Sequence, residues 1–274
     1  MKENLKTDEG QIANPACALC EGENRICMTD IITGKRYAGT PPPGCPYKEM
    51  QETIEKSIEL YKEPENAKMA LISARQEFQN YEWLPGRKLK TNITRIEEIM
   101  DFAKKMGYKK IGIAFCAGLP WEGKVCHQIF EAKGFEVVSV CCKCSSTPKD
   151  SIGIKEYEKI RGPGTLELMC SPITQALVLN KCKVDLAVLM GLCVGHDTLF
   201  IKYLEVPVVV FAVKDRVFGH NPIQALYLSQ GPYYARLLKP EPWEAEAFLE
   251  KTHGRYDDIL KWLEGAKKEE AKEK

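Results

Sequence analysis

The sequence has almost no net charge and no long apolar run, and each shortage excludes a class of function. Lys and Arg number 39 against 38 Asp and Glu, which leaves a formal net charge of +1 and no field that would recruit nucleic acid. The longest apolar stretches, 184–194 and 206–213, are too short to span a bilayer, and the polar start MKENLKTDEG has no apolar signal segment. We therefore expect a cytoplasmic protein that binds neither nucleic acid nor a membrane.

Common nucleotide and hydrolase motifs are missing as well. The chain has no G-x-G-x-x-G, no Walker A and no G-x-S-x-G sequence, so these signatures of dinucleotide, nucleoside triphosphate and serine hydrolase sites are absent. What the chain has instead is 12 cysteines in 274 residues. In a reducing cytoplasm, closely spaced cysteines favour metal binding or catalysis over disulfides.

The chain is predicted to contain a small cysteine-rich segment followed by one larger domain. Residues 1–14 are polar and predicted to be disordered. Residues 15–47 hold four cysteines among Gly and Pro, with little periodicity, and such a segment needs a bound metal in place of a core. Residues 48–264 are predicted to form an α/β domain with N-terminal helices, and 265–274 a charged tail.

Strands and helices alternate from residue 110 onward. The near-continuous apolar runs predict four strands, at 110–116, 135–141, 184–190 and 206–213. Helical periodicity and capping signals predict the helices, two between Tyr47 and Pro85, then 94–106, 121–133, 172–181, 197–204, 222–229, 232–238, 243–251 and 256–263. This pattern predicts an α/β fold with an open, mostly parallel, doubly wound sheet of flavodoxin or Rossmann type, with at least four strands.

A first group of cysteines lies near the N-terminus, at Cys17, Cys20, Cys27 and Cys45. The C-x-x-C pair places two thiolates on one turn, and the other two complete a set of four ligands. Four thiolates suit zinc and an iron–sulfur cluster alike, so the group predicts a metal site of either kind. The plain alternative is a loop with free cysteines.

A second group of six cysteines falls where the predicted strands end, at Cys116, Cys141, Cys142, Cys144, Cys170 and Cys193. Open α/β sheets bind ligands at this edge, and in a flavodoxin-like order the first and third strands flank the binding crevice. Neighbouring side chains in an extended chain alternate faces, so at least one thiol of the Cys-Cys-Lys-Cys run should reach the crevice. Cysteine is also a common core residue, which is how we interpret Cys126 and Cys182.

Histidines are scarce, and two of the four lie beside this edge. His196 with Asp197, and His220 in the loop after the fourth strand, are candidates for proton transfer. In the alternative interpretation, Asp197 and Asn221 only cap helices. The run 214–216 (Lys-Asp-Arg) either binds an anionic substrate or forms a surface ion pair.

These motifs together resemble one known family. They are the N-terminal C-x-x-C, the Cys-Cys-Lys-Cys run at 141–144, Met-Cys-Ser-Pro at 169–172, Gly-Leu-Cys-Val-Gly-His-Asp at 191–197 and Val-Lys-Asp-Arg at 213–216. The chain resembles, over about 17–238, a cysteine-rich family of unknown function from anaerobic microbes that is often labelled as metal-binding. The resemblance implies metal binding and no particular reaction.

The leading hypothesis is an iron–sulfur protein, with a cluster such as 4Fe–4S at the six strand-end cysteines and a metal at the N-terminal four. It would perform redox or Lewis-acid chemistry on a small molecule, or pass electrons to a partner protein, as an oxidoreductase or a sulfur-chemistry enzyme. One alternative is a zinc-binding carrier or interaction protein. Another is a thiol redox or sulfur-transfer enzyme whose nucleophile is Cys142 or Cys144. The pattern of apolar residues in the helices does not predict an oligomeric state.

Overall fold

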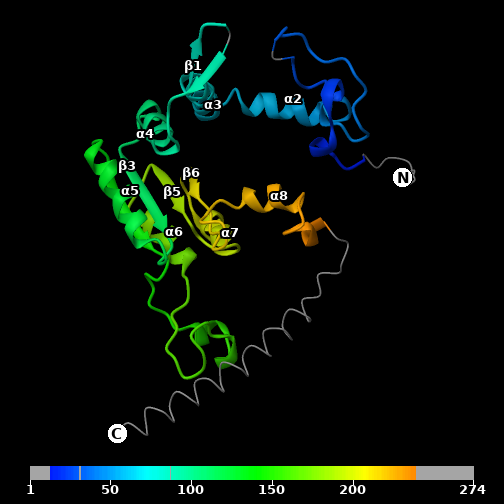
Figure 1. The fold of residues 1–274 in the computed structure, drawn as a ribbon. Helices are drawn as coiled ribbons and strands as arrows, with labels where there is room; N and C mark the ends of the chain where they lie inside the picture. The colour runs from blue at the N-terminus through cyan, green and yellow to red at the C-terminus, as the bar shows by residue number, and fades with distance from the viewer. Residues whose placement is uncertain (1–12, 31, 87, 239–274) are drawn as a thin grey trace, which may run out of the picture. The chain divides into compact units, whose positions relative to one another are not determined.

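The computed structural model describes residues 13–30, 32–86 and 88–238, and the chain divides into two compact units, Met1–Gln79 and Asn80–Lys274 (Figure 1). The helices predicted at 243–251 and 256–263, the charged tail at 265–274 and most of the predicted disordered stretch lie outside the described residues.

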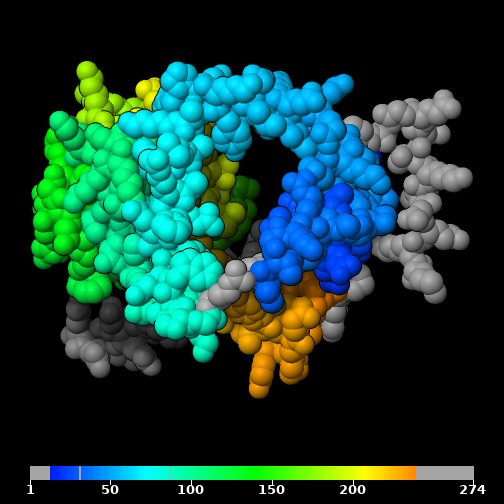
Figure 2. Space-filling view, turned by 90° about the horizontal axis from the view of Figure 1, so that it is seen from above, coloured from blue at the N-terminus to red at the C-terminus, as the bar shows by residue number. Residues whose placement is uncertain are grey.

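The first unit consists of short turns followed by helices. Its elements are η1 (Cys17–Leu19), η2 (Gly22–Asn24), α1 (Pro46–Glu49), α2 (Gln51–Leu60) and α3 (Pro64–Gln79). The two predicted helices after Tyr47 are thereby confirmed. Figure 2 shows α2 and α3, in light blue, as a narrow band of side chains, and apolar residues such as Leu71 and Phe78 are exposed along them.

The second unit opens with a β-hairpin that the sequence analysis missed. Strands β1 (Tyr81–Leu84) and β2 (Lys88–Thr91) pair antiparallel, whereas the pattern predicted only the end of a helix there. Every residue described in both strands is exposed, so no apolar alternation marked them. Helix α4 (Arg95–Met106) follows as predicted, with the Thr94 backbone N–H donating to Glu97 over 2.8 Å and Gly107 in the left-handed region at φ 86°.

The predicted parallel sheet is confirmed. Its strands are β3 (Lys110–Phe115), β4 (Glu136–Cys141), β5 (Leu186–Met190) and β6 (Val208–Ala212), in the order β4-β3-β5-β6 and all parallel. The chain passes from β3 outward to β4 and then returns past β3 to β5. The strand order therefore reverses between β3 and β5, as in a flavodoxin-like sheet, and the carboxyl ends of these two strands are where such sheets bind their ligands.

Helices cover both faces of the sheet (Figure 1). Helix α4 and helix α5 (Pro120–Ala132) pack on one face with the side chains of Ile111 and Val188. Helix α6 (Pro172–Lys181) and helix α7 (His196–Tyr203) pack on the other face with Ala187 and Leu189. Successive β5 residues thus point to opposite cores, which is why the strand is apolar throughout.

Two further segments complete the second unit. An insertion between β4 and α6 contains η3 (Lys149–Ile152) and η4 (Glu156–Glu158) and projects from the sheet as a narrow excursion (Figure 1). After β6 come α8 (Ile223–Ser229) and η5 (Ala235–Leu238). The helix predicted at 232–238 is wrong, because only its last four residues form a 3₁₀ turn. No helix among the described residues has the length and apolar character needed to cross a bilayer.

Candidate functional site

Strand register brings Cys116 and Cys142 together. Phe115 of β3 is opposite Cys141 of β4, so the next residue on each strand forms the following pair. The hydrogen bonds of the sheet continue past the strand ends, because the Cys142 N–H donates to the Phe115 carbonyl over 2.9 Å and the Cys116 N–H donates to Met190 over 3.1 Å. Both cysteines therefore lie at the strand-order reversal.

The insertion returns Cys170 to the same place. Its two ends run antiparallel, with the Met169 N–H donating to Thr147 over 2.8 Å and Pro148 bridging to Leu168. The Ser171 N–H then donates to the Cys142 carbonyl over 2.7 Å. Cysteines 28 residues apart in the sequence are thus joined through backbone contacts.

The three cysteines 116, 142 and 170 form a contacting group that we call the thiol trio. Cys142 is its central member, hydrogen-bonded to Cys116 and to Cys170, and its side chain is only 2% exposed. Cys116 and Cys170 are half-buried. The Cys142 sulfur also accepts the N–H of Ala117 over 3.2 Å, and the Cys116 sulfur accepts the N–H of Gly118 over 3.4 Å. All three pack on the face covered by α6 and α7.

In the trio, the pKa values of the two outer cysteines are lowered and that of the central Cys142 is raised. The hydrogen bond with Cys142 lowers the pKa of Cys116 to about 5, helped by the Gly118 N–H and the Lys214 ammonium and opposed by burial. The hydrogen bond with Cys142 likewise lowers the pKa of Cys170 to about 5, helped by the charges of Lys143 and His196 and opposed by burial. Because Cys142 holds the shared proton and is buried, its own pKa is raised. Cys142 has one S–H, so it can donate to one thiolate at a time, and the trio titrates as a coupled group.

Lysines supply the positive charge around the trio. The Lys214 ammonium lies over two glycines, since a Cβ built on Gly118 would be 3.6 Å from Lys214 Nζ and one on Gly191 would be 4.0 Å from it. Lys143 donates through Nζ to the carbonyl of Leu168. Lys143 was missed as a site residue in the sequence because it stands inside the cysteine run. Lys214 was interpreted as part of an anion site or of a surface ion pair.

The remaining strand-end cysteines have other partners, although Cys141 packs against the same core as the trio. Burial and the neighbouring Cys141 raise the pKa of Cys144, and the Cys144 N–H donates to the Cys141 carbonyl over 3.1 Å. The Cys193 sulfur accepts a hydrogen bond from Arg216 over 3.1 Å. Residues 142–145 form a turn and not an extended chain, so the alternation expected for this run does not apply, although Cys142 is buried and Cys144 is exposed.

Two cysteines serve as packing residues, as predicted. Cys126 belongs to the core between the sheet and α5, where burial raises its pKa to about 12. Cys182, at the end of α6, packs against the core on the opposite face. All 12 cysteines are free thiols in the structure, which agrees with the expectation that they form no disulfides.

The three predicted proton-transfer residues have different surroundings. His196 begins α7 and is close enough to Cys170 to act on its pKa. The Asp197 carboxylate accepts the N–H groups of Gly195 and Thr198 over 3.0 and 2.8 Å, so it orders the start of the helix. His220 is in the left-handed region at φ 69°, and its Nδ1 lies 3.2 Å from the Asp215 N–H, within its own loop. Of the three, His196 is the one whose charge acts on a cysteine of the trio.

A buried glutamine also holds this edge of the sheet together, and only its place in an apolar helix could have indicated it in the sequence. Gln175 of α6 is fully buried, and its Nε2 donates to the carbonyls of Val140 and Phe115 over 2.7 and 3.2 Å. Its Oε1 has no hydrogen-bond partner among the described residues. Gln175 therefore joins β4 to β3 directly below the trio.

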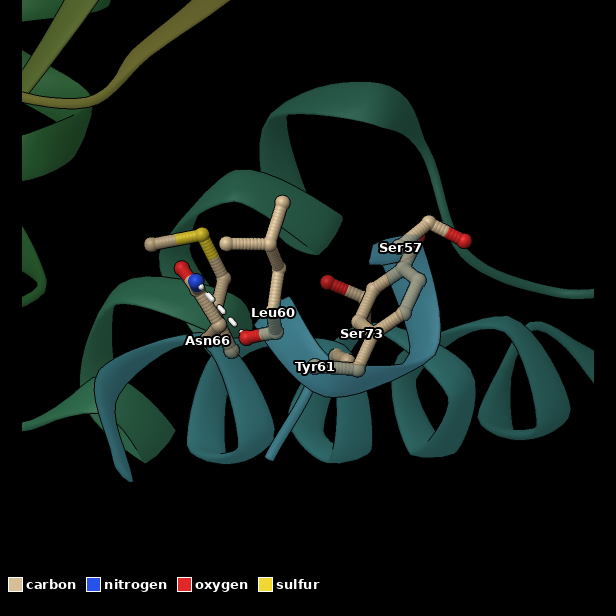
Figure 3. Close-up of a pocket in the computed structure, with 7 residues that line it drawn as sticks. Ser57, Leu60, Tyr61, Asn66 and Ser73 are labelled. Atoms are coloured by element: carbon tan, nitrogen blue, oxygen red, sulfur yellow. Dashed lines mark hydrogen bonds between the residues drawn. The ribbon is translucent and has the colours of Figure 1, made fainter. Parts of the chain in front are cut away.

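The four N-terminal cysteines line one cavity in the first unit. The cavity measures about 490 Å³, and Cys17, Cys20, Cys27 and Cys45 all contribute to its wall. A cavity of about 630 Å³ between α2 and α3, where Asn66 donates to the Leu60 carbonyl over 3.0 Å, is lined by no cysteine (Figure 3). The predicted N-terminal residues are thus brought together.

The donor chemistry of both groups suits soft metals. Thiolates are the ligands that iron–sulfur clusters and zinc prefer. Among the described residues, no group of three or more His, Cys, Asp or Glu side chains is arranged to hold a single metal ion. In the trio, Cys142 contacts both Cys116 and Cys170. In the first unit, the four cysteines line a cavity.

Comparison with known proteins places this arrangement in a family. Residues 45–211 match the family described as "Protein of unknown function (DUF1847)". The uncharacterized protein MJ0455 of Methanocaldococcus jannaschii is 45% identical over 188 residues, which cover 69% of this chain and 89% of that protein. The matched range begins at Cys45 and contains all six strand-end cysteines. The predicted resemblance to an uncharacterised family is confirmed.

Proposed function

The chain belongs to the DUF1847 family, and from its own residues we propose that it is a metal–thiolate protein with an iron–sulfur cluster at the thiol trio. The observation that carries this proposal is the meeting of Cys116, Cys142 and Cys170 at the strand-order reversal. That crevice is where open α/β sheets bind their ligands.

The residues around the trio support a role in small-molecule chemistry. Cys116, Cys142 and Cys170 would hold the cluster, which would supply electrons or a Lewis acid to a small molecule bound at this edge. The Lys214 and Lys143 side chains balance thiolate charge and favour an anionic substrate. His196, beside Cys170, is the candidate for holding a proton at this edge.

Metal and sulfide content test the proposal. The full chain, purified without oxygen, should contain iron and acid-labile sulfide. The variant Cys116→Ser/Cys142→Ser/Cys170→Ser should lose part of both. The matched control Cys141→Ser/Cys144→Ser/Cys193→Ser replaces three cysteines of the same edge outside the trio and should keep them. Zinc without sulfide would instead support a zinc carrier, and equal iron in both variants would contradict a cluster at the trio.

A second candidate is a thiol redox or sulfur-transfer enzyme, and the lowered pKa of Cys116 favours it. A thiolate at neutral pH is the reactive form of cysteine. Cys142 and Cys144 are poorer nucleophiles than the sequence suggested, because the pKa of each is raised. Alkylation followed by mass spectrometry separates the two functions. Rapid alkylation of Cys116 in the metal-loaded protein favours the enzyme, and protection favours the cluster.

A further inference from the structure

The cavity in the first unit draws its four cysteines from separate segments. Cys17 and Cys20 flank the η1 turn, where the Cys20 N–H donates to the Cys17 carbonyl over 3.2 Å. Cys27 directly precedes a turn closed by a bridge between Thr29 and Arg36. Cys45 precedes α1. The four cysteines that line this one cavity therefore come from three separate segments of the sequence.

The rest of the cavity wall is largely apolar. Ile26, Met28, Pro42 and Ile54 line it together with the cysteines. Arg25 also lines the cavity, and its Nε donates to the Cys20 carbonyl over 2.7 Å. An apolar shell with a nearby cation suits a group that carries negative charge and soft ligands.

The segment around the cavity has no hydrophobic core of its own. Among residues 13–30 and 32–50, the only buried residue is Gly44. Apolar burial therefore cannot stabilise this segment, and its fold needs another source of stability. A metal group bound in the cavity would link the three cysteine-bearing segments at once.

Backbone contacts shape the segment around this space. The Gly39 N–H donates to the Glu23 carbonyl over 2.9 Å, and the Thr40 N–H donates to Asn24 Oδ1 over 3.0 Å. At Gly44, φ is 76° and a Cβ would be 2.3 Å from the Ala13 carbonyl oxygen, so only glycine permits this approach. The neighbouring Cys45 is thereby held at the cavity wall.

We propose that this cavity binds a second iron–sulfur cluster, of the 4Fe–4S class, through Cys17, Cys20, Cys27 and Cys45. The inference does not depend on the function proposed for the thiol trio. A single zinc ion draws four sulfurs to about 2.3 Å from one point, which leaves no room between them. A cavity of about 490 Å³ lined by four cysteines has room for a group of several atoms.

Metal analysis of matched variants of the full chain tests this site. In Cys17→Ser/Cys20→Ser/Cys27→Ser/Cys45→Ser, iron and sulfide should each fall by about four per chain relative to the unmodified protein. The trio variant Cys116→Ser/Cys142→Ser/Cys170→Ser should keep this share. Unchanged iron in the N-terminal variant, or loss of about one zinc without sulfide, would overturn the proposal.

Alkylation of the unmodified protein gives an independent readout if the quadruple variant does not accumulate. Under anaerobic conditions, iodoacetamide should leave the four N-terminal cysteines unmodified until the iron is removed with acid and a chelator. Rapid labelling of all four in the iron-loaded protein would contradict the site. Because labelling is read cysteine by cysteine, failure here leaves the result for the trio intact.

Discussion

The backbone N–H of Ser171 donates to the carbonyl oxygen of Cys142 over 2.7 Å. This bond docks the end of the insertion against the end of β4, and it holds Cys170 beside the central thiol. The candidate site thus depends on how the insertion closes. The tip of the insertion is not part of the trio.

Shortening the insertion should therefore preserve the trio. The N–H of Lys149 donates to the Glu167 carbonyl over 2.9 Å, a spacing that a two-residue Asn-Gly turn can close. Replacing residues 150–166 with Asn-Gly should leave the ionisation of Cys116 and Cys170 unchanged, as measured by alkylation against pH. If Cys170 alone reverts to an ordinary thiol, the tip contributes to the site after all.

Removing the central thiol should abolish the early ionisation of its neighbours. In the metal-free, reduced protein, Cys116 with a pKa of about 5 is a thiolate from pH 6 upward, so its alkylation rate should be nearly flat between pH 6 and 8. Cys142→Ala removes the hydrogen bond that lowers this pKa. The pKa should rise, and the rate at pH 6 should fall on the order of a hundredfold. Cys144→Ala, in the same run of residues, is the control and should leave the profile flat.

The two lysines should act on different cysteines. Lys214 lowers the pKa of Cys116, and Lys143 lowers that of Cys170. Lys214→Gln should raise the pKa of Cys116 more than that of Cys170, and Lys143→Gln should raise that of Cys170 more than that of Cys116, so each variant controls for the other. The ionisation of each thiol can be followed by thiolate absorbance or by residue-resolved alkylation. Equal shifts of both cysteines in either variant would contradict this assignment.

Gln175→Leu should destabilise the second unit. The change removes the two hydrogen bonds that Nε2 donates to the backbone carbonyls of Val140 and Phe115, near the ends of β4 and β3. We expect a loss of about 1–3 kcal/mol in the free energy of unfolding, partly offset because the unpartnered Oε1 is also removed. Denaturant unfolding of the variant and the unmodified protein measures this change in the free energy of unfolding. Leu177→Gln, at an exposed position on the same helix, should change stability little.

Much of the fold could be predicted from the pattern of apolar residues. The four strands of the parallel sheet and α4 to α7 lie where the sequence indicated, because strands buried on both faces are apolar throughout and capping residues mark helix ends. The hairpin of β1 and β2 could not be found this way, since it is exposed. Its pairing comes from backbone hydrogen bonds, which leave no apolar pattern in the sequence.

The candidate site was predictable only in part. The sequence placed six cysteines at the sheet edge, because strand ends can be read from periodicity. It could not separate Cys116, Cys142 and Cys170 from the other three. That selection depends on strand register and on a closing contact across an insertion, both of which are long-range. Lys143 and Gln175 were missed for the same reason.

By itself, the sequence determined a parallel α/β sheet, a high content of cysteine and the division of these cysteines into an N-terminal group and a sheet-edge group. Tertiary structure alone decided which thiols meet. Register set Cys116 beside Cys142, the folded-back insertion added Cys170, and the turns of the first unit arranged four cysteines around one cavity. The physical reason is that sulfur ionisation and metal binding act over a few ångströms, and such distances are fixed only when distant segments pack together.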